Sequence, residues 1–175
     1  MAGTARGRRL AAPAGDDTRP TSDKVRGAIF NVLGQFFDGG RVLDLYAGTG
    51  ALALEALSRG FAEATCVDAS AGAAEAISRN ARACGFTGKV TVIRRRVKDA
   101  LASLPPGGFD LAFVDPPYAE GPGDALEALG RVLRTGASVV AEHDRRSPPP
   151  ERIGGLLLRD RRAYGDTGIS IYRRE

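Results

Sequence analysis

The sequence predicts an α/β fold, in which a doubly wound, mostly parallel sheet carries helices on both faces. From residue 21 onwards, short apolar runs of strand length alternate with segments of helical periodicity, a pattern typical of strands joined by crossover helices. The 175 residues are 43% hydrophobic and 26% charged, ordinary values for a chain that forms one core. We therefore expect one domain over residues 21–175, preceded by a basic N-terminal arm over residues 1–20.

The first expected element is a helix over about residues 21–37. Thr21 or Ser22 can act as its N-cap, and Asp38-Gly39-Gly40 breaks it. Its apolar residues fall at helical spacing: Val25, Ile29, Val32, Leu33 and Phe36.

The next segments predict the parallel sheet. Five apolar runs have the length and β-branched content of buried parallel strands, over residues 41–46, 64–68, 90–93, 109–114 and 137–141. Helices are expected between them, near residues 51–59, 70–84, 99–104 and 123–134.

The C-terminal end departs from this alternation. Residues 156–164 and 168–173 alternate like strands and are separated by Gly165-Asp166-Thr167, with no helix between them. This pattern predicts a closing antiparallel hairpin, which makes seven strands in all.

Composition and charge indicate a cellular compartment and a kind of partner. Two isolated cysteines, Cys66 and Cys84, fit a reducing cytosol, and the absence of a long apolar run or signal sequence fits a cytoplasmic protein without a membrane segment. The chain carries a net charge of +4, and its basic residues gather in two clusters. This distribution suits a polyanionic partner and equally a solvated basic face. The clusters are Arg6, Arg8 and Arg9, and Arg94, Arg95, Arg96 and Lys98.

A glycine-rich loop, Asp44-Leu45-Tyr46-Ala47-Gly48-Thr49-Gly50, follows the first expected strand and precedes a helix. Glycines there let the backbone turn sharply and approach a ligand, beyond the carboxyl ends of the strands. Asp68 closes the next strand, where an acid can accept the two ribose hydroxyls of a nucleoside. Because NAD and S-adenosylmethionine both contain adenosine, the loop leaves the choice between them open.

The motif Asp115-Pro116-Pro117-Tyr118 follows the fourth expected strand. An exocyclic amine on a nucleic-acid base is a poor nucleophile, because its lone pair is delocalised into the ring. The Asp115 carboxylate and the Pro116 carbonyl can accept its two N–H bonds and localise that pair. Pro117 holds the carbonyl rigid, and Tyr118 offers a ring face to the base. The alternative is a proline turn that ends a strand, with Tyr118 capping the core.

Six segments together carry a family resemblance: Gly7-Arg8-Arg9-Leu10, Arg19 to Arg26, Phe30-Asn31, Asp44 to Gly50, Leu54 to Gly60 and Asp115 to Tyr118. The Asp-Pro-Pro-Tyr motif alone indicates amino-group methylation of adenine, cytosine or guanine. With the Arg-Pro-Thr segment and the Ser-Arg-Gly helix end, the chain resembles, along nearly its whole length, the bacterial 16S ribosomal RNA guanine-N2 methyltransferases of the small-subunit type.

This resemblance implies a Rossmann-like class I methyltransferase fold with S-adenosylmethionine as cofactor. Gly48 and Gly50 are expected close to the methionine part of the cofactor, Asp44 near its ammonium, Asp68 at the ribose, and Asp99 or the backbone near Lys98 at the adenine; Asp99 is equally a candidate helix N-cap. The other residues expected to bind the cofactor are Tyr46, Ala47, Thr49 and Ala69.

The catalytic residues expected from the resemblance are Asp115, Pro116, Pro117 and Tyr118. The expected partner is ribosomal RNA or a small-subunit assembly particle, and Arg6, Arg8, Arg9 and Arg19 of the arm are the candidate residues for contact with it. We expect a monomer without a metal. His143, the only histidine, shows no Asp or Ser partner in the sequence, so neither a triad nor a metal role is expected.

Three other functions stay open at this point. A DNA adenine-N6 or cytosine-N4 methyltransferase uses the same four-residue motif, but it usually carries a target-recognition domain. An RNA-binding relative without catalysis and an NAD-dependent dehydrogenase are the other two.

Overall fold

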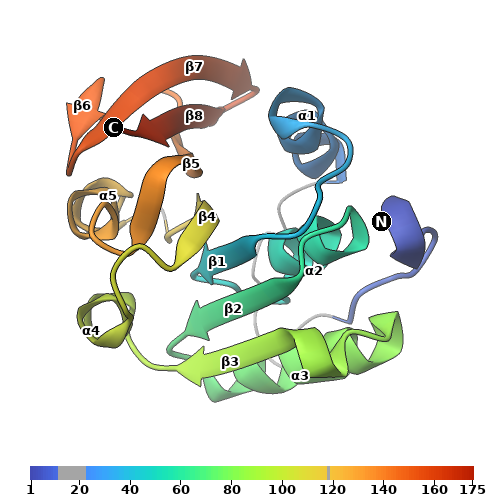
Figure 1. Ribbon diagram of the computed structural model, residues 1–175. Helices are drawn as coiled ribbons and strands as arrows, with labels where there is room; N and C mark the ends of the chain where they lie inside the picture. The colour runs from blue at the N-terminus through green and yellow to red at the C-terminus, as the bar shows by residue number, and fades with distance from the viewer. Residues whose placement is uncertain (12–22, 118) are drawn as a thin grey trace.

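The computed structural model describes residues 1–11, 23–117 and 119–175. One eight-stranded sheet forms its centre, with the strand order β3-β2-β1-β4-β5-β8-β7-β6 (Figure 1). Strands β1 to β5 are parallel, and β8, β7 and β6 add to them in antiparallel fashion. The predicted α/β class is confirmed. The count of seven strands is wrong by one, because the edge strand β6 has only two residues, too few to leave a hydrophobic pattern.

The strands are β1 Arg41–Leu45, β2 Glu63–Asp68, β3 Val90–Arg94, β4 Phe109–Val114, β5 Leu133–Asp144, β6 Arg152–Ile153, β7 Leu156–Tyr164 and β8 Thr167–Arg174. The helices are α1 Asp23–Leu33, α2 Ala51–Ser58, α3 Ala71–Cys84, α4 Val97–Ser103 and α5 Gly123–Leu129, with two short 3₁₀ turns, η1 Gly3–Ala5 and η2 Thr87–Lys89.

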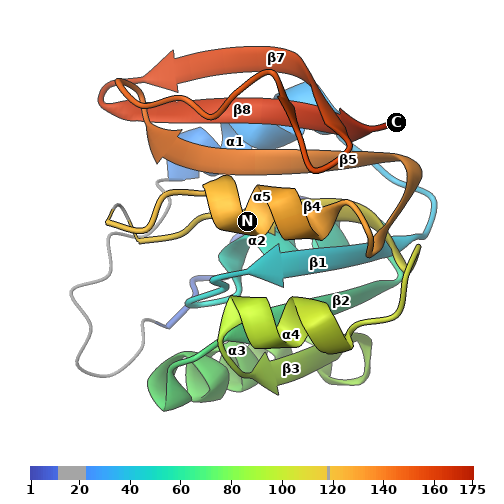
Figure 2. The ribbon, with the colours of Figure 1, turned by 90° about the vertical axis from the view of Figure 1, so that its left-hand side faces the viewer.

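The helices cover both faces of the sheet. Helices α1, α2 and α3 lie on one face and α4 and α5 on the other (Figures 1 and 2), and each face has its own hydrophobic core. The central strands β1 and β4 are buried along nearly their whole length, as expected for parallel strands between two helical layers. Every loop after a parallel strand therefore opens at the same edge of the sheet, where ligands bind in such folds.

Helix α1 is shorter than predicted. It ends at Leu33, because Gly34 adopts a φ of +126°. Phe36, which we expected on its apolar face, is 79% exposed. The predicted start and N-cap, Thr21 or Ser22, lie outside the described residues.

Helix α5 also ends early, at Leu129 rather than near residue 134, and β5 begins at Leu133 rather than residue 137. At Gly130 the chain lies so close to a neighbouring loop that a Cβ atom there would be 2.0 Å from the carbonyl oxygen of Gly154. The boundary thus depends on a contact between segments 24 residues apart in the sequence.

The end of α2 carries a buried ionic cluster. Glu55 is 2% exposed; its carboxylate accepts the Nε–H of Arg59 at 2.8 Å and lies 3.5 Å from Nε of Arg26. The Arg59 guanidinium also lies over the Phe30 ring. Gly60 then turns the chain at a φ of +115°, where a Cβ would be 2.0 Å from the Phe37 oxygen. The Ser-Arg-Gly segment is therefore structural.

Residues 1–11 pack against α2 and α3. The Ala2 N–H donates to Glu55 and the Ala5 N–H to the Ser58 hydroxyl, and Ala5 is buried. Farther along, the Asn80 side chain holds Ala11 through hydrogen bonds in both directions. The first part of the predicted arm is thus attached to the domain, and residues 12–20 lie outside the described residues.

Candidate active site

The loop between β1 and α2 makes the sharp turn that its glycines predict. Gly48 and Gly50 have φ values of +54° and +75°. A Cβ on Gly50 would meet Ile77 at 3.3 Å, whereas one on Gly48 would point into open space, with its nearest neighbour the Tyr46 oxygen at 4.0 Å. Tyr46 itself has a φ of +61°, a strained conformation for a bulky residue that the sequence did not reveal. The space above Gly48 can admit a ligand close to the backbone.

Asp68, at the end of β2, reaches this loop. One carboxylate oxygen accepts the N–H of Gly48 at 2.9 Å, and the other accepts the N–H of Ser70 at 2.9 Å. Each carboxylate oxygen has a second lone pair, so Asp68 can still accept hydroxyl donors. The structure thus brings together the glycine loop and the acid expected at the ribose.

Asp44 is almost completely buried, and one of its oxygens accepts the N–H of Ala53 in the first turn of α2. Burial raises the pKa of the Asp44 carboxyl well above its ordinary value. The bond from Ala53 opposes this, and the carboxylates of Asp115 and Asp68 raise it further. The three acids therefore form a negative field at this edge of the sheet, which favours a cationic ligand and disfavours a pyrophosphate. A cationic ligand such as S-adenosylmethionine suits this field.

Replacing Asp44 with Asn should stabilise the free protein. A raised pKa means that the folded state binds the Asp44 proton more tightly than the unfolded state does. The free energy of unfolding therefore falls as the pH rises from the unfolded-state pKa of this carboxyl to its folded-state pKa. We expect Asp44→Asn to raise the free energy of unfolding by roughly 1 kcal/mol at neutral pH, or about 2–4 °C in Tm. The gain should shrink as the pH falls and vanish below about pH 3, under the ordinary Asp pKa of about 3.9, where both states carry the proton.

Thermal unfolding between about pH 3 and pH 8 measures this change in stability. Glu75→Gln removes an exposed acid on α3 and is the matched control, with no gain expected. A Tm for Asp44→Asn at or below that of the unmodified protein at neutral pH would contradict the field described here.

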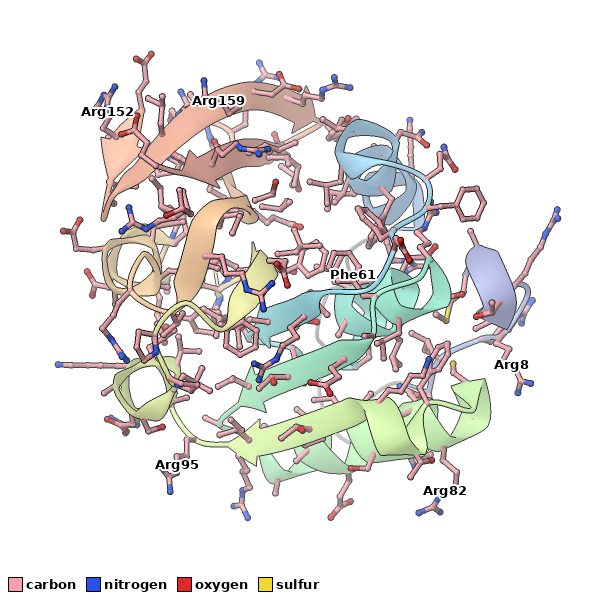
Figure 3. All side chains as sticks on the ribbon, in the orientation of Figure 1. Arg8, Phe61, Arg82, Arg95, Arg152 and Arg159 are labelled. Carbon is pink, nitrogen blue, oxygen red and sulfur yellow. The ribbon has the colours of Figure 1, made fainter. Side chains whose placement is uncertain are left out.

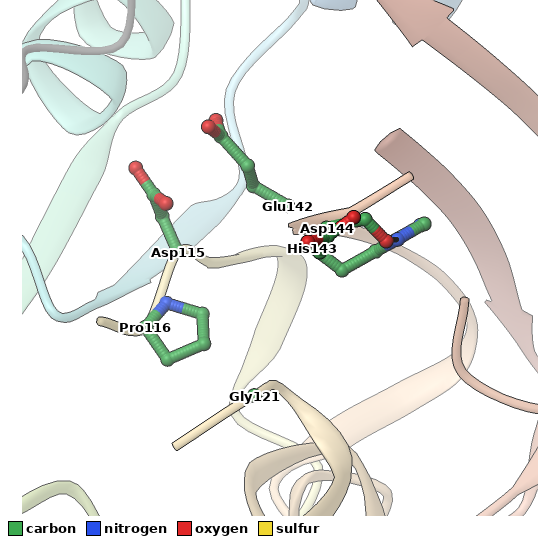
Figure 4. Close-up of a pocket in the computed structure, with 6 residues that line it drawn as sticks. All are labelled: Asp115, Pro116, Gly121, Glu142, His143 and Asp144. Carbon is green, nitrogen blue, oxygen red and sulfur yellow. Dashed lines mark hydrogen bonds between the residues drawn. The ribbon is translucent and has the colours of Figure 1, made fainter. Parts of the chain in front are cut away.

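Asp115 and Pro116 lie at the end of β4, beside the end of β5. With Gly121, Glu142, His143 and Asp144 they line a small pocket (Figure 4). Asp115 is half-buried, Pro116 is buried and Pro117 is exposed. The Asp115 carboxylate therefore lines the pocket rather than the hydrophobic interior, as amine orientation requires. Tyr118 lies outside the described residues.

His143 has a partner that the sequence did not reveal. Its Nδ1 donates to the main-chain oxygen of Asp144 at 2.8 Å, and its Nε2 accepts the Ser170 hydroxyl at 2.9 Å. The expectation of no Ser partner was wrong, because Ser170 comes from β8, which pairs with β5 in antiparallel register. Burial is the main cause that lowers the pKa of His143. His143 lines the pocket, whereas Ser170 is fully buried, so the Ser170 hydroxyl is not placed as a nucleophile.

The connection between β3 and α4 lies beside Asp68, because the Arg95 N–H donates to the Asp68 main-chain oxygen at 3.1 Å. Lys98 and Asp99 follow in the first turn of α4 and are exposed. Helix α4 begins at Val97 with Arg96 as N-cap, so the alternative role of Asp99 as N-cap is wrong. Contact of Lys98 and Asp99 with an adenine stays a prediction.

The basic residues of the N-terminal segment lie at the surface. Arg6, Arg8 and Arg9 are exposed, and Figure 3 shows Arg8 at the outer edge of the molecule, far from Arg152 and Arg159. Through Asn80, which also donates to the Thr49 oxygen, Ala11 lies beside the glycine loop. Arg19 is outside the described residues. The segment thus leads from a basic surface towards the candidate site.

Residues 1–173 match the model of a protein family described as "Conserved hypothetical protein 95". The chain belongs to this family. Among the relatives of this chain, "Putative rRNA methyltransferase YlbH" of Bacillus subtilis is 42% identical over 99% of the chain and 97% of the relative. "Ribosomal RNA small subunit methyltransferase D" of Escherichia coli is 35% identical over 100% and 89%.

A solved structure, "Putative methyltransferase yhhF from Escherichia coli", superposes with a TM-score of 0.84 at 30% identity, covering 100% of this chain and 96% of that one. The predicted fold class is therefore confirmed: this chain has the Rossmann-like fold of class I S-adenosylmethionine-dependent methyltransferases. No helix among the described residues is long and apolar enough to cross a membrane. Within the same residues, no group of three or more His, Cys, Asp or Glu side chains suits a metal ion.

Proposed function

We propose that this protein transfers a methyl group from S-adenosylmethionine to the exocyclic N2 of a guanine in 16S ribosomal RNA. The observation that carries the proposal is the place of Asp115 and Pro116, which line a pocket at the end of β4 in a chain whose relatives are named ribosomal RNA methyltransferases. The glycine loop and Asp68 lie at the same edge of the sheet, so the site for the methyl donor adjoins the site for the base that accepts the methyl group.

The residues around the glycine loop fit S-adenosylmethionine. Gly48 leaves room for close approach to the backbone, Asp68 accepts the ribose hydroxyls, and Asp44 stabilises the positive charge of the ammonium. Tyr46, Ala47, Thr49 and Gly50 form the rest of the loop, Ala69 follows Asp68, and Lys98 and Asp99 border the adenine. The cofactor supplies a methyl carbon on a sulfonium, whose C–S bond breaks with its electron pair passing to sulfur.

The protein's part in the reaction is to prepare the amine. The target base leaves its stack and enters the pocket, because its amino group is otherwise occupied by pairing or stacking. The Asp115 carboxylate and the Pro116 carbonyl accept the two N2–H bonds, so the lone pair of N2 points at the methyl carbon as the new C–N bond forms. One N2 proton then leaves to water. Pro117 fixes the carbonyl, and Tyr118 covers the ring of the base.

Parallel methyl-transfer assays test this function. Labelled methyl should pass to 30S particles or to naked 16S RNA, with N2-methylguanosine as the product nucleoside, and not to DNA. A product of N6-methyladenosine or N4-methylcytosine would refute the proposal. Absence of transfer to every substrate would favour an RNA-binding relative without catalysis.

The exposed arginines of the N-terminal segment should contribute to RNA affinity. Arg6→Gln combined with Arg9→Gln should raise KM for the RNA substrate roughly tenfold and lower the slope of log KM against log salt by about 2. With fewer phosphate contacts, fewer counterions are released when the RNA binds. kcat should stay the same. Steady-state kinetics at several salt concentrations measure both effects.

Arg152→Gln combined with Arg159→Gln is the matched control. It removes the same charge from exposed positions that lie far from Arg8 of the N-terminal segment (Figure 3), and it should change KM much less. Equal effects of the two pairs would show that only overall charge matters.

A further inference from the structure

The pocket at the end of β4 contains a second carboxylate next to Asp115. Val114 and Ala141 are partners in the parallel ladder of β4 and β5, so Asp115 and Glu142, the next residue on each strand, stand side by side. Since side chains of laterally paired residues share a face of the sheet, both point the same way. In Figure 4 the two carboxylates extend to the same side of the pocket. A base whose amine is held by Asp115 therefore presents its neighbouring atoms to Glu142.

His143 and Asp144 also line the pocket, and both form hydrogen bonds within the protein. Both ring nitrogens of His143 are in hydrogen bonds, to Asp144 and Ser170. The Asp144 carboxylate accepts the main-chain N–H and the guanidinium of Arg146, and in Figure 4 it lies away from the two neighbouring carboxylates. Glu142, which stands beside Asp115 on the neighbouring strand, is the pocket carboxylate that a base would meet next to its amine.

The atom beside the amine distinguishes the bases. In guanine the N2 amine adjoins N1, which carries a hydrogen. In adenine and cytosine the amine adjoins a ring nitrogen with a bare lone pair. An ionised carboxylate is an acceptor only, so it binds the guanine edge and repels the other two.

We propose that Glu142 is a specificity residue that accepts the N1–H of the target guanine while Asp115 and Pro116 hold N2. The inference rests on the proposed function and names the group that makes it specific for guanine. Three donors in a row, N1–H and the two N2–H, meet three acceptors. Adenine and cytosine are rejected because the lone pair of their ring nitrogen would face the Glu142 carboxylate, which is also an acceptor.

A base analogue isolates this contact. 2-Aminopurine keeps the exocyclic 2-amino group but has a lone pair at N1 in place of the hydrogen. The guanine that the unmodified protein methylates is first mapped. 2-Aminopurine then replaces this guanine in 16S RNA that is reconstituted into 30S particles. The unmodified protein should prefer guanine over 2-aminopurine by about 10²-fold or more in kcat/KM, as sites built around a hydrogen bond do.

Glu142→Gln should reverse part of this preference, because its amide N–H can donate to N1 of 2-aminopurine. We expect kcat/KM on guanine to fall by about 10²-fold and kcat/KM on 2-aminopurine to be kept or raised, so that the ratio collapses. Binding of S-adenosylhomocysteine and Tm should hardly change. Glu75→Gln, the same change on the outer surface of α3, should leave the ratio as it was.

Glu142→Asp gives a second measure, since it keeps the carboxylate with a shorter reach. It should slow transfer to guanine without favouring 2-aminopurine. If the unmodified protein makes N2-methylguanosine and Glu142→Gln leaves the preference ratio unchanged, the role of Glu142 is refuted and the proposed function stands. If the unmodified protein methylates a different base, both are refuted.

Discussion

Replacement of Asp115 by Ala should abolish methyl transfer and leave cofactor binding nearly intact. The carboxylate lines the pocket at the end of β4, whereas the glycine loop and Asp68 belong to β1 and β2. Loss of one prepositioned group that stabilises a transition state lowers kcat by about 10³-fold. Single-turnover transfer to 30S particles measures the rate, and titration with S-adenosylhomocysteine measures the Kd, which should change by less than about threefold.

Asp115→Asn refines the test. The amide keeps one oxygen acceptor but loses the charge, so its rate should lie between those of the unmodified protein and of Asp115→Ala. Near-normal transfer by Asp115→Ala would show that the amine is oriented by other groups. A parallel loss of cofactor binding would instead assign Asp115 to the cofactor site.

The core of the fold was predictable because the central strands are buried on both faces. A strand in that position is an unbroken apolar run, and the predicted bounds of β4, residues 109–114, are those observed. The end of α5 was not predictable, because it depends on the close approach of Gly130 to the distant Gly154. Local periodicity contains no information on such a contact.

Some residues of the candidate site could likewise be predicted from the sequence, and others could not. Asp68 and Asp115 each end a parallel strand, and parallel strands end at a common edge, so their proximity to the glycine loop followed from the strand assignments. Glu142 and Ser170 were missed, because their positions depend on the register of β5 against β4 and β8. An apolar run shows that a strand exists, but it does not show which residue faces which on the neighbouring strand.

The buried cluster around Glu55 connects the site to the stability of the fold. Helix α2 carries Glu55, and the first turn of the same helix donates an N–H to Asp44 in the glycine loop. Glu55 also accepts the Ala2 N–H and so anchors the basic N-terminal segment. A change that displaces α2 therefore disturbs both the glycine loop and the N-terminal segment that is proposed to contact RNA.

Glu55→Ala should cost about 3–5 kcal/mol of unfolding free energy, because Arg59 and Arg26 stay buried without the carboxylate that compensates their charge. That is a large part of the roughly 5–15 kcal/mol that stabilises a typical domain. Chemical denaturation should show a lower midpoint with an unchanged slope. Glu63→Ala breaks the exposed pair with Arg41 and should cost less than about 1 kcal/mol. Equal losses in the two variants would mean that the Glu55 cluster is as hydrated as a surface pair.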